Sequence, residues 1–389
     1  MNNKKITEYC TGCRACEQLC AHHAIVMKSD KEGFVTACID EDLCVECGLC
    51  SKRCPQNNLI AKSVQMASLA VRDKDDEELA ISASGGAFAA AARVVLQHDG
   101  VVVGAAYNED MTVSHILVER LEDLYKVQSS KYVQSNTEAT YCEVKKLLRQ
   151  GRDVLYSGTP CQIGGLKAYL RKDYDNLYTM DLICHGVASP KLFAKYLIWL
   201  GGKMNGKIIG YDFRDKSCGW GLDYMTKTKT KTKTKTKTKP STLDPYYFHF
   251  LKGSTYRECC YRCNYCTKER VGDITIGDYW GIEKEHPEFY STKGVSCLLV
   301  NTEKGIRLWN LVKNEFDSLE STFEQVARAN HNLSHPTQRT SLRDSIYQHI
   351  DDMDVNKYFA TQLAIPFNLK ARIKMMLPKW LKIWIKKNK

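Results

Sequence analysis

The sequence predicts a small cysteine-rich α+β module followed by a larger α/β core with a mixed sheet. Two observations support this fold class. Nine of the 18 cysteines in the 389-residue chain lie before residue 55, which sets a short first segment apart. Beyond it, short apolar runs alternate with helical stretches, a pattern typical of a sheet covered by helices. A chain of this length is expected to form two or three domains.

Two cysteine runs share one spacing, with two, two and three residues between successive cysteines. They comprise Cys10, Cys13, Cys16 and Cys20, then Cys44, Cys47, Cys50 and Cys54. Over residues 5–57 the chain resembles bacterial two-cluster ferredoxins, although Ala21 replaces the proline expected after the first run. In that pattern the fourth cysteine of each run ligates the other cluster. We therefore expect one [4Fe–4S] cluster on Cys10, Cys13, Cys16 and Cys54, and a second on Cys44, Cys47, Cys50 and Cys20. Structural zinc is the alternative, and it favours paired Cys-x-x-Cys units.

The remaining elements follow from local pattern. We expect strands at 66–71, 101–107, 113–119, 153–157, 177–183, 208–213, 273–276 and 297–300. We expect helices at 84–97, 137–150, 160–170, 190–200 and 304–316. Pro160 falls in the first turn of its helix, and Gly151 ends another, as helix termini prefer. This alternation indicates an α/β core with a largely buried sheet.

Two short segments are candidates for anion binding. Ser84, Gly85 and Gly86 open a helix, whose amides and positive dipole end could hold a phosphate. The segment 158–162 lies at a strand-to-helix turn, where α/β folds place ligands. A Ser-Gly-Gly is also an ordinary helix cap, so neither segment identifies a ligand by itself.

A second cysteine set suggests a third cluster. Cys161 and Cys184 end two expected strands, and four more cysteines crowd together at Cys259, Cys260, Cys263 and Cys266. Cys161, Cys184, Cys260 and Cys263 would supply the four ligands of a cluster. Sets in which Cys259 or Cys266 replaces one of them would do so too, and the spacing does not choose between these sets. The alternative is two buried thiols and a zinc site in the later group.

Six segments resemble the beta subunit of coenzyme F-420 (deazaflavin) hydrogenase and dehydrogenase. They are SGGAFAAAARVV at 84–95, SSKYVQS at 129–135, GTPCQIGGLKAYL at 158–170, DLICHGVASPKLF at 181–193, FRDK at 213–216 and GDITIGDYWGI at 272–282. The resemblance implies a flavin-binding α/β core that carries FAD beside a [4Fe–4S] cluster. Its motifs place flavin contacts at Ser84, Gly85, Gly86, Lys131, Tyr132, Thr159 and Gln162, and the core cluster at Cys161, Cys184, Cys260 and Cys263. His185 is a candidate proton donor, with a structural histidine as the alternative.

The Thr-Lys repeat at 226–239 departs from the relatives, which usually carry a strand pair there. Its seven lysines account for most of the net charge of +11 and leave 49 basic against 45 acidic residues. Charge therefore gives no reason to expect nucleic-acid binding. Perfect alternation is compatible with a strand that carries threonine on one side and lysine on the other. Since every pair is identical, however, we expect no apolar burial and a solvated, mobile loop.

The C-terminal tail is strongly basic. Beyond Asp354 there are nine basic residues and no acidic ones, and apolar residues recur from Ile373 to Trp384 at helical spacing. Tryptophans and lysines on opposite faces suit a helix at a membrane surface, and Pro378 starts or kinks it. Packing on the protein's own surface is the alternative. No apolar leader and no 18-residue apolar run are present, so we expect a cytoplasmic protein whose tail is a candidate for contact with the inner face of the cell membrane.

The expected domains are a two-cluster ferredoxin domain at 1–60, two parts of a flavoprotein core at 61–150 and 151–330, and a helical basic tail at 331–389. We expect an iron–sulfur flavoprotein oxidoreductase that passes electrons from ferredoxin-type clusters through a core cluster to FAD and an unidentified organic substrate. Ferredoxin or another redox protein is the expected partner. The alternative is a non-enzymatic electron-transfer subunit that feeds a partner oxidoreductase.

Overall fold

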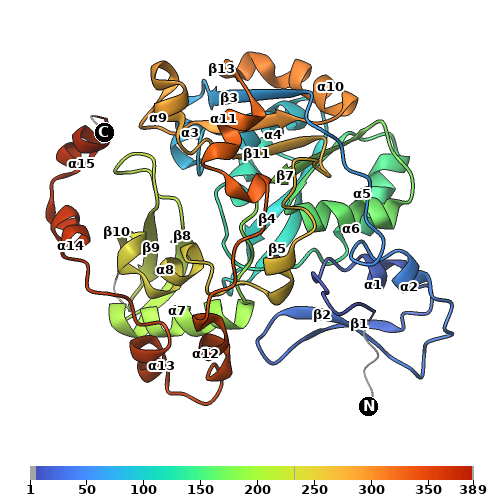
Figure 1. Cartoon of the computed structure of the whole chain (residues 1–389), viewed down its shortest axis with the longest axis horizontal. Helices are drawn as coiled ribbons and strands as arrows, with labels where there is room; N and C mark the ends of the chain where they lie inside the picture. The colour runs from blue at the N-terminus through green and yellow to red at the C-terminus, as the bar shows by residue number, and fades with distance from the viewer. Residues whose placement is uncertain (1–5, 232, 388–389) are drawn as a thin grey trace.

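The computed structural model describes residues 6–231 and 233–387 (Figure 1). The start of the expected N-terminal domain, one threonine of the repeat and the last two residues of the tail lie outside the described residues.

The N-terminal module is a β-hairpin joined to two short helices. Strands β1 (Ile25–Ser29) and β2 (Val35–Ile39) pair antiparallel, and α1 (Ala15–Leu19) packs on α2 (Leu49–Lys52). Each helix is preceded by a left-handed residue, Arg14 at φ 62° and Gly48 at φ 69°. Each of these residues directly follows the second cysteine of its run, so the two runs share a backbone conformation as well as a spacing. The predicted α+β module is confirmed.

The core is built on one eight-stranded sheet (Figure 1). In spatial order its strands are β13 (Phe316–Ser321), β3 (Ala67–Asp73), β12 (Ser296–Val300), β11 (Ile274–Asp278), β7 (Leu177–Leu182), β6 (Val154–Gly158), β4 (Val101–Tyr107) and β5 (Val113–Val118). Strands β11, β7, β6 and β4 are parallel to one another. The outer pairings are antiparallel, so the predicted mixed sheet is confirmed.

Helices cover both faces of this sheet. Successive strand residues point to opposite faces, so Val102 packs in one buried cluster and Val103 in another. Strands buried on both faces read as continuous apolar runs, which is why β4 begins with three valines. One face carries α4 (Ala87–Gln97) and α10 (Glu303–Val312), and the other carries α5 (Thr140–Arg149) and α6 (Pro160–Leu170).

Most predicted boundaries agree with the structure to within three residues. The helix expected from residue 84 begins at Ala87 because Gly86, at φ 78°, turns the chain just before it. The helix expected at 190–200 continues as α7 (Pro190–Met204). The helix expected at 304–316 is too long, since α10 ends at Val312 and β13 starts at Phe316.

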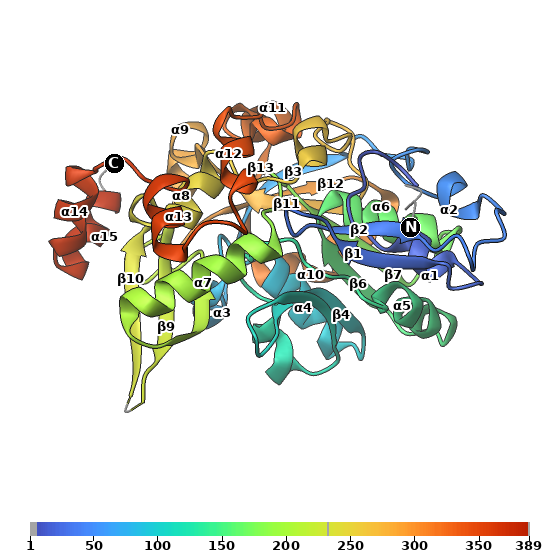
Figure 2. The same ribbon diagram turned by 90° about the horizontal axis from the view of Figure 1, so that it is seen from below.

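The Thr-Lys repeat is a β-hairpin, and the prediction of a solvated loop was wrong. Strands β9 (Asp223–Lys229) and β10 (Thr234–Pro240) pair antiparallel, and β8 (Lys207–Asp212) completes a three-stranded sheet. Thr226 and Thr228 are buried, and their hydroxyls contact the sulfur of Met204 on α7. Figure 2 shows α7 lying against this sheet. Alternation therefore works as in any half-covered strand, because α7 covers the side of β9 that carries Thr226 and Thr228.

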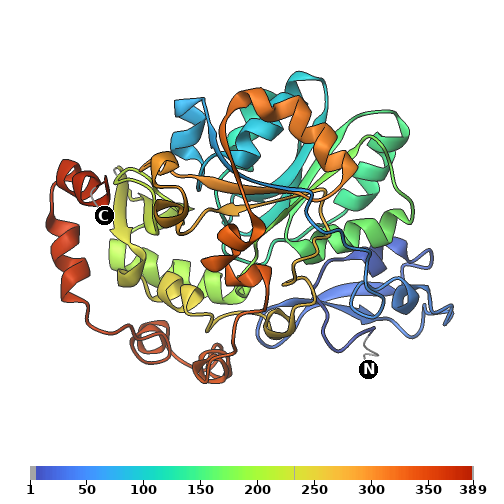
Figure 3. The same cartoon turned by 45° about the horizontal axis from the view of Figure 1, so that its top comes forward.

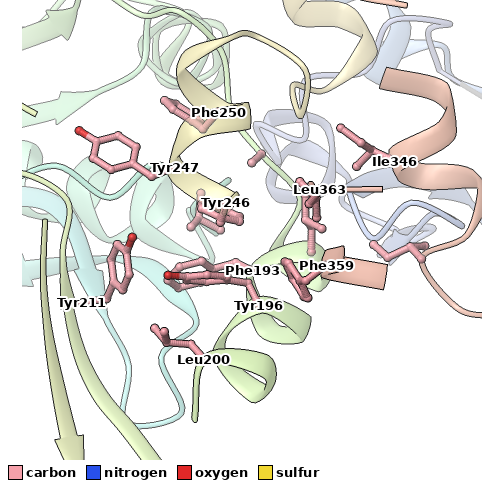
Figure 4. Packing of buried hydrophobic residues seen from close by; sticks show 14 of the residues in the cluster. Phe193, Tyr196, Leu200, Tyr211, Tyr246, Tyr247, Phe250, Ile346, Phe359 and Leu363 are labelled. Carbon is pink, nitrogen blue, oxygen red and sulfur yellow. The ribbon is translucent and has the colours of Figure 1, made fainter. Parts of the chain in front are cut away.

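An aromatic cluster joins this second sheet to the helices that follow it (Figure 4). Phe193 and Tyr196 of α7 pack with Tyr211 of β8, Tyr246 and Phe359. The helices α8 (Pro245–Leu251), α12 (Leu342–Gln348) and α13 (Val355–Thr361) contribute residues to this cluster. The chain then continues into α14 (Leu369–Met376) and α15 (Lys379–Lys387).

The remaining short helices are α3 (Asp76–Ile81), α9 (Ile282–Glu285) and α11 (Phe323–Arg328). The 3₁₀ turns are η1 (Leu121–Lys126), η2 (Ser241–Leu243), η3 (Glu258–Arg262), η4 (Pro287–Phe289), η5 (Lys313–Glu315) and η6 (His331–Leu333). Within the described ranges, no helix combines the length and apolarity needed to cross a membrane.

Candidate cofactor sites

A cavity of about 520 Å³ opens at the carboxyl ends of the central parallel strands. Residues that follow β6, β7 and β11 line it, including Thr159, Cys184 and Asp278. Open α/β sheets bind ligands at this edge. The volume lies within the range of about 300–1,000 Å³ that is usual for small-molecule and cofactor sites.

The structure brings nearly all of the expected flavin contacts to this cavity. Those that line it are Ser84, Gly86, Lys131, Tyr132, Thr159 and Gln162, together with the candidate proton donor His185. Gly85 does not line it. A Cβ on Gly85 would lie 2.3 Å from the backbone nitrogen of Ser296 and 2.4 Å from the carbonyl oxygen of Val71. Gly85 therefore allows close packing against β3 and β12.

The N-terminus of α4 opens into the cavity without a side-chain cap. Gly86 precedes the helix, and the residues of its first turn line the cavity. Uncapped amides and the positive end of the helix dipole favour an anionic group. This end of α4 fits the phosphate part of a nucleotide cofactor.

Lys131 brings a cation to the same cavity. Its ammonium donates to the carbonyl oxygens of Gln128 at 2.5 Å, Lys126 at 3.2 Å and Ser129 at 3.4 Å. In the described part of the chain no salt bridge holds it. Burial lowers the pKa of Lys131 to about 7, against the opposing effect of Asp212. An anion in the cavity would offset the cost of burying this charge.

Thr159 and Gln162 are committed to a helix cap. The backbone amide of Thr159 donates to Oε1 of Gln162 at 3.0 Å, in a capping box at the start of α6. The amide nitrogen of Gln162 donates to the Ser135 hydroxyl at 2.9 Å. That hydroxyl lies 3.2 Å from Nδ1 of His115, whose pKa burial lowers to about 4. Sequence reasoning missed His115, because a single histidine inside a strand carries no distinguishing signal.

A buried ion pair between Arg214 and Asp278 forms another wall, which sequence reasoning also missed. The guanidinium donates to both carboxylate oxygens at 2.6 Å, and Nε1 of Trp220 donates to Asp278 at 2.9 Å. Arg214 lies over the Trp280 ring, which stacks on Trp220. Burial raises the pKa of Asp278, but the charge and hydrogen bonds of Arg214 outweigh it and leave a lowered pKa. Both residues belong to segments that carry the family resemblance.

His185 lines the cavity directly after Cys184 and meets the ring of His331 edge-on, at 5.9 Å between centroids. Burial and the neighbouring His331 lower the pKa of His185. The imidazole is therefore neutral near pH 7, and a proton-donor role would use a neutral ring nitrogen.

Four cysteines of the N-terminal module surround a small cavity of their own. They are Cys10, Cys13, Cys16 and Cys54, which combine three members of the first run with the last of the second. Burial, together with the neighbouring thiols Cys10 and Cys54, raises the pKa of Cys13 to about 12. Thiolates gathered here need positive charge beside them, which iron supplies. The donor set therefore fits the predicted exchange of fourth ligands.

The other module cysteines lie nearer the surface. Cys50 of α2 has its pKa raised by burial and by Cys44 and Cys47. Cys47 is exposed. Helix α1 packs on α2 and ends at Cys20, which brings Cys20 to the same part of the module.

All six core cysteines gather beyond the carboxyl ends of β6 and β7. Burial raises the pKa of Cys161 and Cys184, and Cys263 adds to both shifts. The hydrogen bond with Cys259, followed by burial, raises the pKa of Cys260. The side chains of Cys259 and Cys260 form a hydrogen bond, and so do those of Cys263 and Cys266. The structure thus brings the expected ligands together and leaves Cys259 and Cys266 beside them as rivals. Arg270, paired with Asp181 at 3.2 Å, partly opposes the raised pKa of Cys184. The hydrogen bond with Cys266, with a smaller effect of Arg270, lowers the pKa of Cys263 to about 7.

Tyr265 lies between the module cysteines and the core cysteines. It is 3% exposed, and its hydroxyl has no hydrogen-bond partner among the residues that the structure describes. Its pKa is raised by burial and by Cys161, Cys13, Cys263 and Cys54. It shares one buried cluster with Cys13, Cys161 and Cys263. Both cysteine sets therefore lie close to Tyr265, and Tyr141 likewise lies near Cys13 and Cys161.

No three Cys, His, Asp or Glu side chains in the described ranges converge closely enough to hold one metal ion. A cuboidal cluster spaces its thiolates farther apart than a single ion does, so this finding concerns mononuclear sites.

Comparisons with known proteins agree with the domain order. Residues 9–58 match the family model of a 4Fe-4S dicluster domain. Residues 151–322 match the model of the C-terminal part of the coenzyme F420 hydrogenase/dehydrogenase beta subunit. No curated protein matches the chain. A solved structure of the F420-reducing [NiFe] hydrogenase complex from Methanosarcina barkeri contains a similar chain, with 16% identity, a TM-score of 0.48, and coverage of 70% of this chain and 90% of that one. The two matched segments support the resemblance to the coenzyme F420 hydrogenase/dehydrogenase beta subunit family over residues 151–322 and place a 4Fe-4S dicluster domain at residues 9–58.

Proposed function

We propose that the chain is an iron–sulfur flavoprotein oxidoreductase that passes electrons from ferredoxin-type clusters through a core cluster to FAD and an organic substrate. One observation carries the proposal. Cys184 lines the large cavity and also belongs to the core cysteine set, so a cluster there would adjoin whatever the cavity holds. Clusters supply single electrons, and a flavin converts them to the two-electron chemistry of organic substrates.

The proposed ligands follow the three cysteine groups. Cys10, Cys13, Cys16 and Cys54 hold the cluster nearer the core, and Cys44, Cys47, Cys50 and Cys20 hold the outer one. In the core the proposed ligands are Cys161, Cys184, Cys260 and Cys263. The exposed Cys47 makes the outer site the accessible end for ferredoxin or another redox protein, and Tyr265 lies between the inner site and the core set.

FAD is proposed for the large cavity because its anion-binding groups are already placed. The uncapped start of α4 and the ammonium of Lys131 suit a pyrophosphate, whereas Tyr132 and Gln162 line the wall beside them. His185 is the proposed proton donor to substrate, from a neutral ring that adjoins Cys184.

A lysine variant tests the flavin site. Lys131→Met removes one ammonium from the cavity lining. Lys195→Met is its matched control, since Lys195 also donates to backbone carbonyls but lies outside the cavity. Hydrogen bonds to charged groups contribute about 1.5–3 kcal/mol. We therefore expect Lys131→Met to weaken FAD binding at least about tenfold, measured by quenching of flavin fluorescence, with no change in Lys195→Met. Equal binding by both variants would remove Lys131 from the site.

The alternative is an electron-transfer subunit that feeds a partner oxidoreductase, and the family match is compatible with it. Flavin content and turnover of the isolated chain separate the two. A chain that binds FAD and oxidises or reduces an organic compound alone is an enzyme. A chain that is reduced by ferredoxin and passes electrons only to a second protein is the subunit.

A further inference from the structure

The tail carries a contiguous set of exposed large apolar side chains. Met376 is 82% exposed, Phe367 72% and Trp380 69%. Leu369, Ile373 and Met376 follow a spacing of four and three residues, so they share one face of α14, and all three are exposed. Soluble surfaces rarely gather such residues without a partner.

Positive charge surrounds this apolar face. The nine basic and no acidic residues that follow Asp354 include Lys370, Arg372, Lys379 and Lys387, all exposed. The face is therefore both apolar and cationic, which is the complement of an anionic lipid surface. An acidic protein would match the charge but would not need the exposed methionine and tryptophan.

The tail is held in place against the Thr-Lys hairpin. Helix α14 lies beside β10, and the ammonium of Lys386 in α15 donates to the carbonyl oxygen of Gly219 at 2.6 Å and pairs with Asp223 at 3.3 Å. The hydroxyl of Tyr290 donates to the carbonyl oxygen of Lys386 at 2.9 Å. Exposed lysines of the hairpin, including Lys227, Lys235 and Lys237, thus belong to the two strands against which the tail packs.

We propose that α14 and α15 form a docking face for an anionic membrane surface, and that the Thr-Lys hairpin adds positive charge beside it. Short amphipathic helices with tryptophan and lysine lie in the plane of the headgroups, and each basic residue near an anionic leaflet strengthens binding about fivefold. Pro378 supports this arrangement by breaking the tail into two short helices, since Leu377 is extended between them.

Docking by this face would orient the whole molecule. Figure 3 shows the N-terminal module and the C-terminal helices at opposite ends, and the other views agree. The exposed Cys47 would then face water, where a soluble redox partner can reach it. The membrane proposal does not depend on the proposed cofactors, because binding can be measured without electron transfer.

Co-sedimentation of the full chain with vesicles tests the proposal. Vesicles of phosphatidylcholine alone are compared with vesicles that also contain phosphatidylglycerol, and we expect at least about tenfold stronger binding to the latter, falling with added salt. Absence of binding, or equal binding to both vesicles, would overturn the proposal.

Three sets of variants assign the effect to residues. Lys370→Gln, Lys379→Gln and Lys387→Gln together remove tail charge, and we expect at least about a tenfold loss of binding to anionic vesicles. Met376→Gln with Trp380→Gln removes apolar contact at unchanged charge, and we expect a comparable loss. The control combines Lys28→Gln, Lys172→Gln and Lys284→Gln, which are exposed lysines elsewhere with the same change in net charge, and it should retain binding within about twofold.

A loss in the control equal to that in the tail variant would show that net charge alone drives binding, and would overturn the assignment to the tail. Lys231→Gln, Lys235→Gln and Lys237→Gln together test the hairpin, and unchanged binding would remove it from the face. Circular dichroism of each variant establishes that the fold is retained.

Discussion

Removal of Arg214 should destabilise the protein strongly, because it leaves a buried carboxylate without its partner. The side chain of Arg214 is 1% exposed and that of Asp278 is 15% exposed, and two hydrogen bonds of 2.6 Å join them. In Arg214→Met the carboxylate retains the indole of Trp220 as a donor. Breaking a buried pair from one side costs about 3–5 kcal/mol. We expect the free energy of unfolding at pH 7 to fall by this amount in urea titrations followed by circular dichroism.

A double variant separates the lost pair from lost packing. Arg214→Met with Asp278→Leu removes both charges and should recover most of the stability, because apolar replacements of a buried pair are often neutral. A single variant that costs less than about 1 kcal/mol, or a double variant less stable than the single, would refute this reasoning.

The pH dependence gives a second check on the same pair. In the wild-type protein Asp278 has a lowered pKa, so its contribution is present above the unfolded pKa and is lost as pH falls through the folded one. Without Arg214 only burial remains, which raises the pKa. The stability of Arg214→Met should therefore decrease as pH rises from 5 to 8, relative to the wild type.

Two further predictions concern close packing and a buried amine. A Cβ on Gly165 would lie 2.8 Å from Cβ of Cys13, so Gly165→Ala should displace the N-terminal module and lower the iron content by about four atoms per chain. Gly202→Ala, where nothing lies within 4 Å, is the control and should be neutral or stabilising by up to about 1 kcal/mol. Burial lowers the pKa of Lys131 and of Lys216 to about 7 in the folded protein. Above this pH the unfolded chain keeps protons that the folded protein has lost. Each lysine therefore makes the free energy of unfolding rise as pH increases from about 7 towards the lysine pKa of the unfolded chain. Lys131→Met should flatten part of that rise in unfolding titrations, and an unchanged slope would contradict it.

The predictable parts of this structure are those that local sequence determines. The cysteine spacing places Cys10, Cys13, Cys16 and Cys54 around one cavity, and Pro160 marks the start of α6. The order of the core strands and helices was also predictable. A strand that is buried on both faces reads as a continuous apolar run, which stands out from the helical stretches between the strands.

The features that the sequence did not predict depend on contacts between residues that are distant in the chain. Arg214 and Asp278 are 64 residues apart, and nothing in either segment indicates the other. The alternation of the Thr-Lys repeat is compatible with a strand, but its identical pairs do not indicate which positions are buried. The structure distinguishes Thr228, covered by Met204, from the exposed Thr236. A repeat acquires buried and exposed positions only from what packs against it.

The central claim is that electrons pass through three clusters to a flavin in one chain. The most direct test is to measure iron, acid-labile sulfide and flavin on protein purified without oxygen. At four irons per cube, the account predicts about twelve irons and one FAD per chain. About eight irons without flavin would contradict it, and would leave a dicluster protein that serves a partner enzyme.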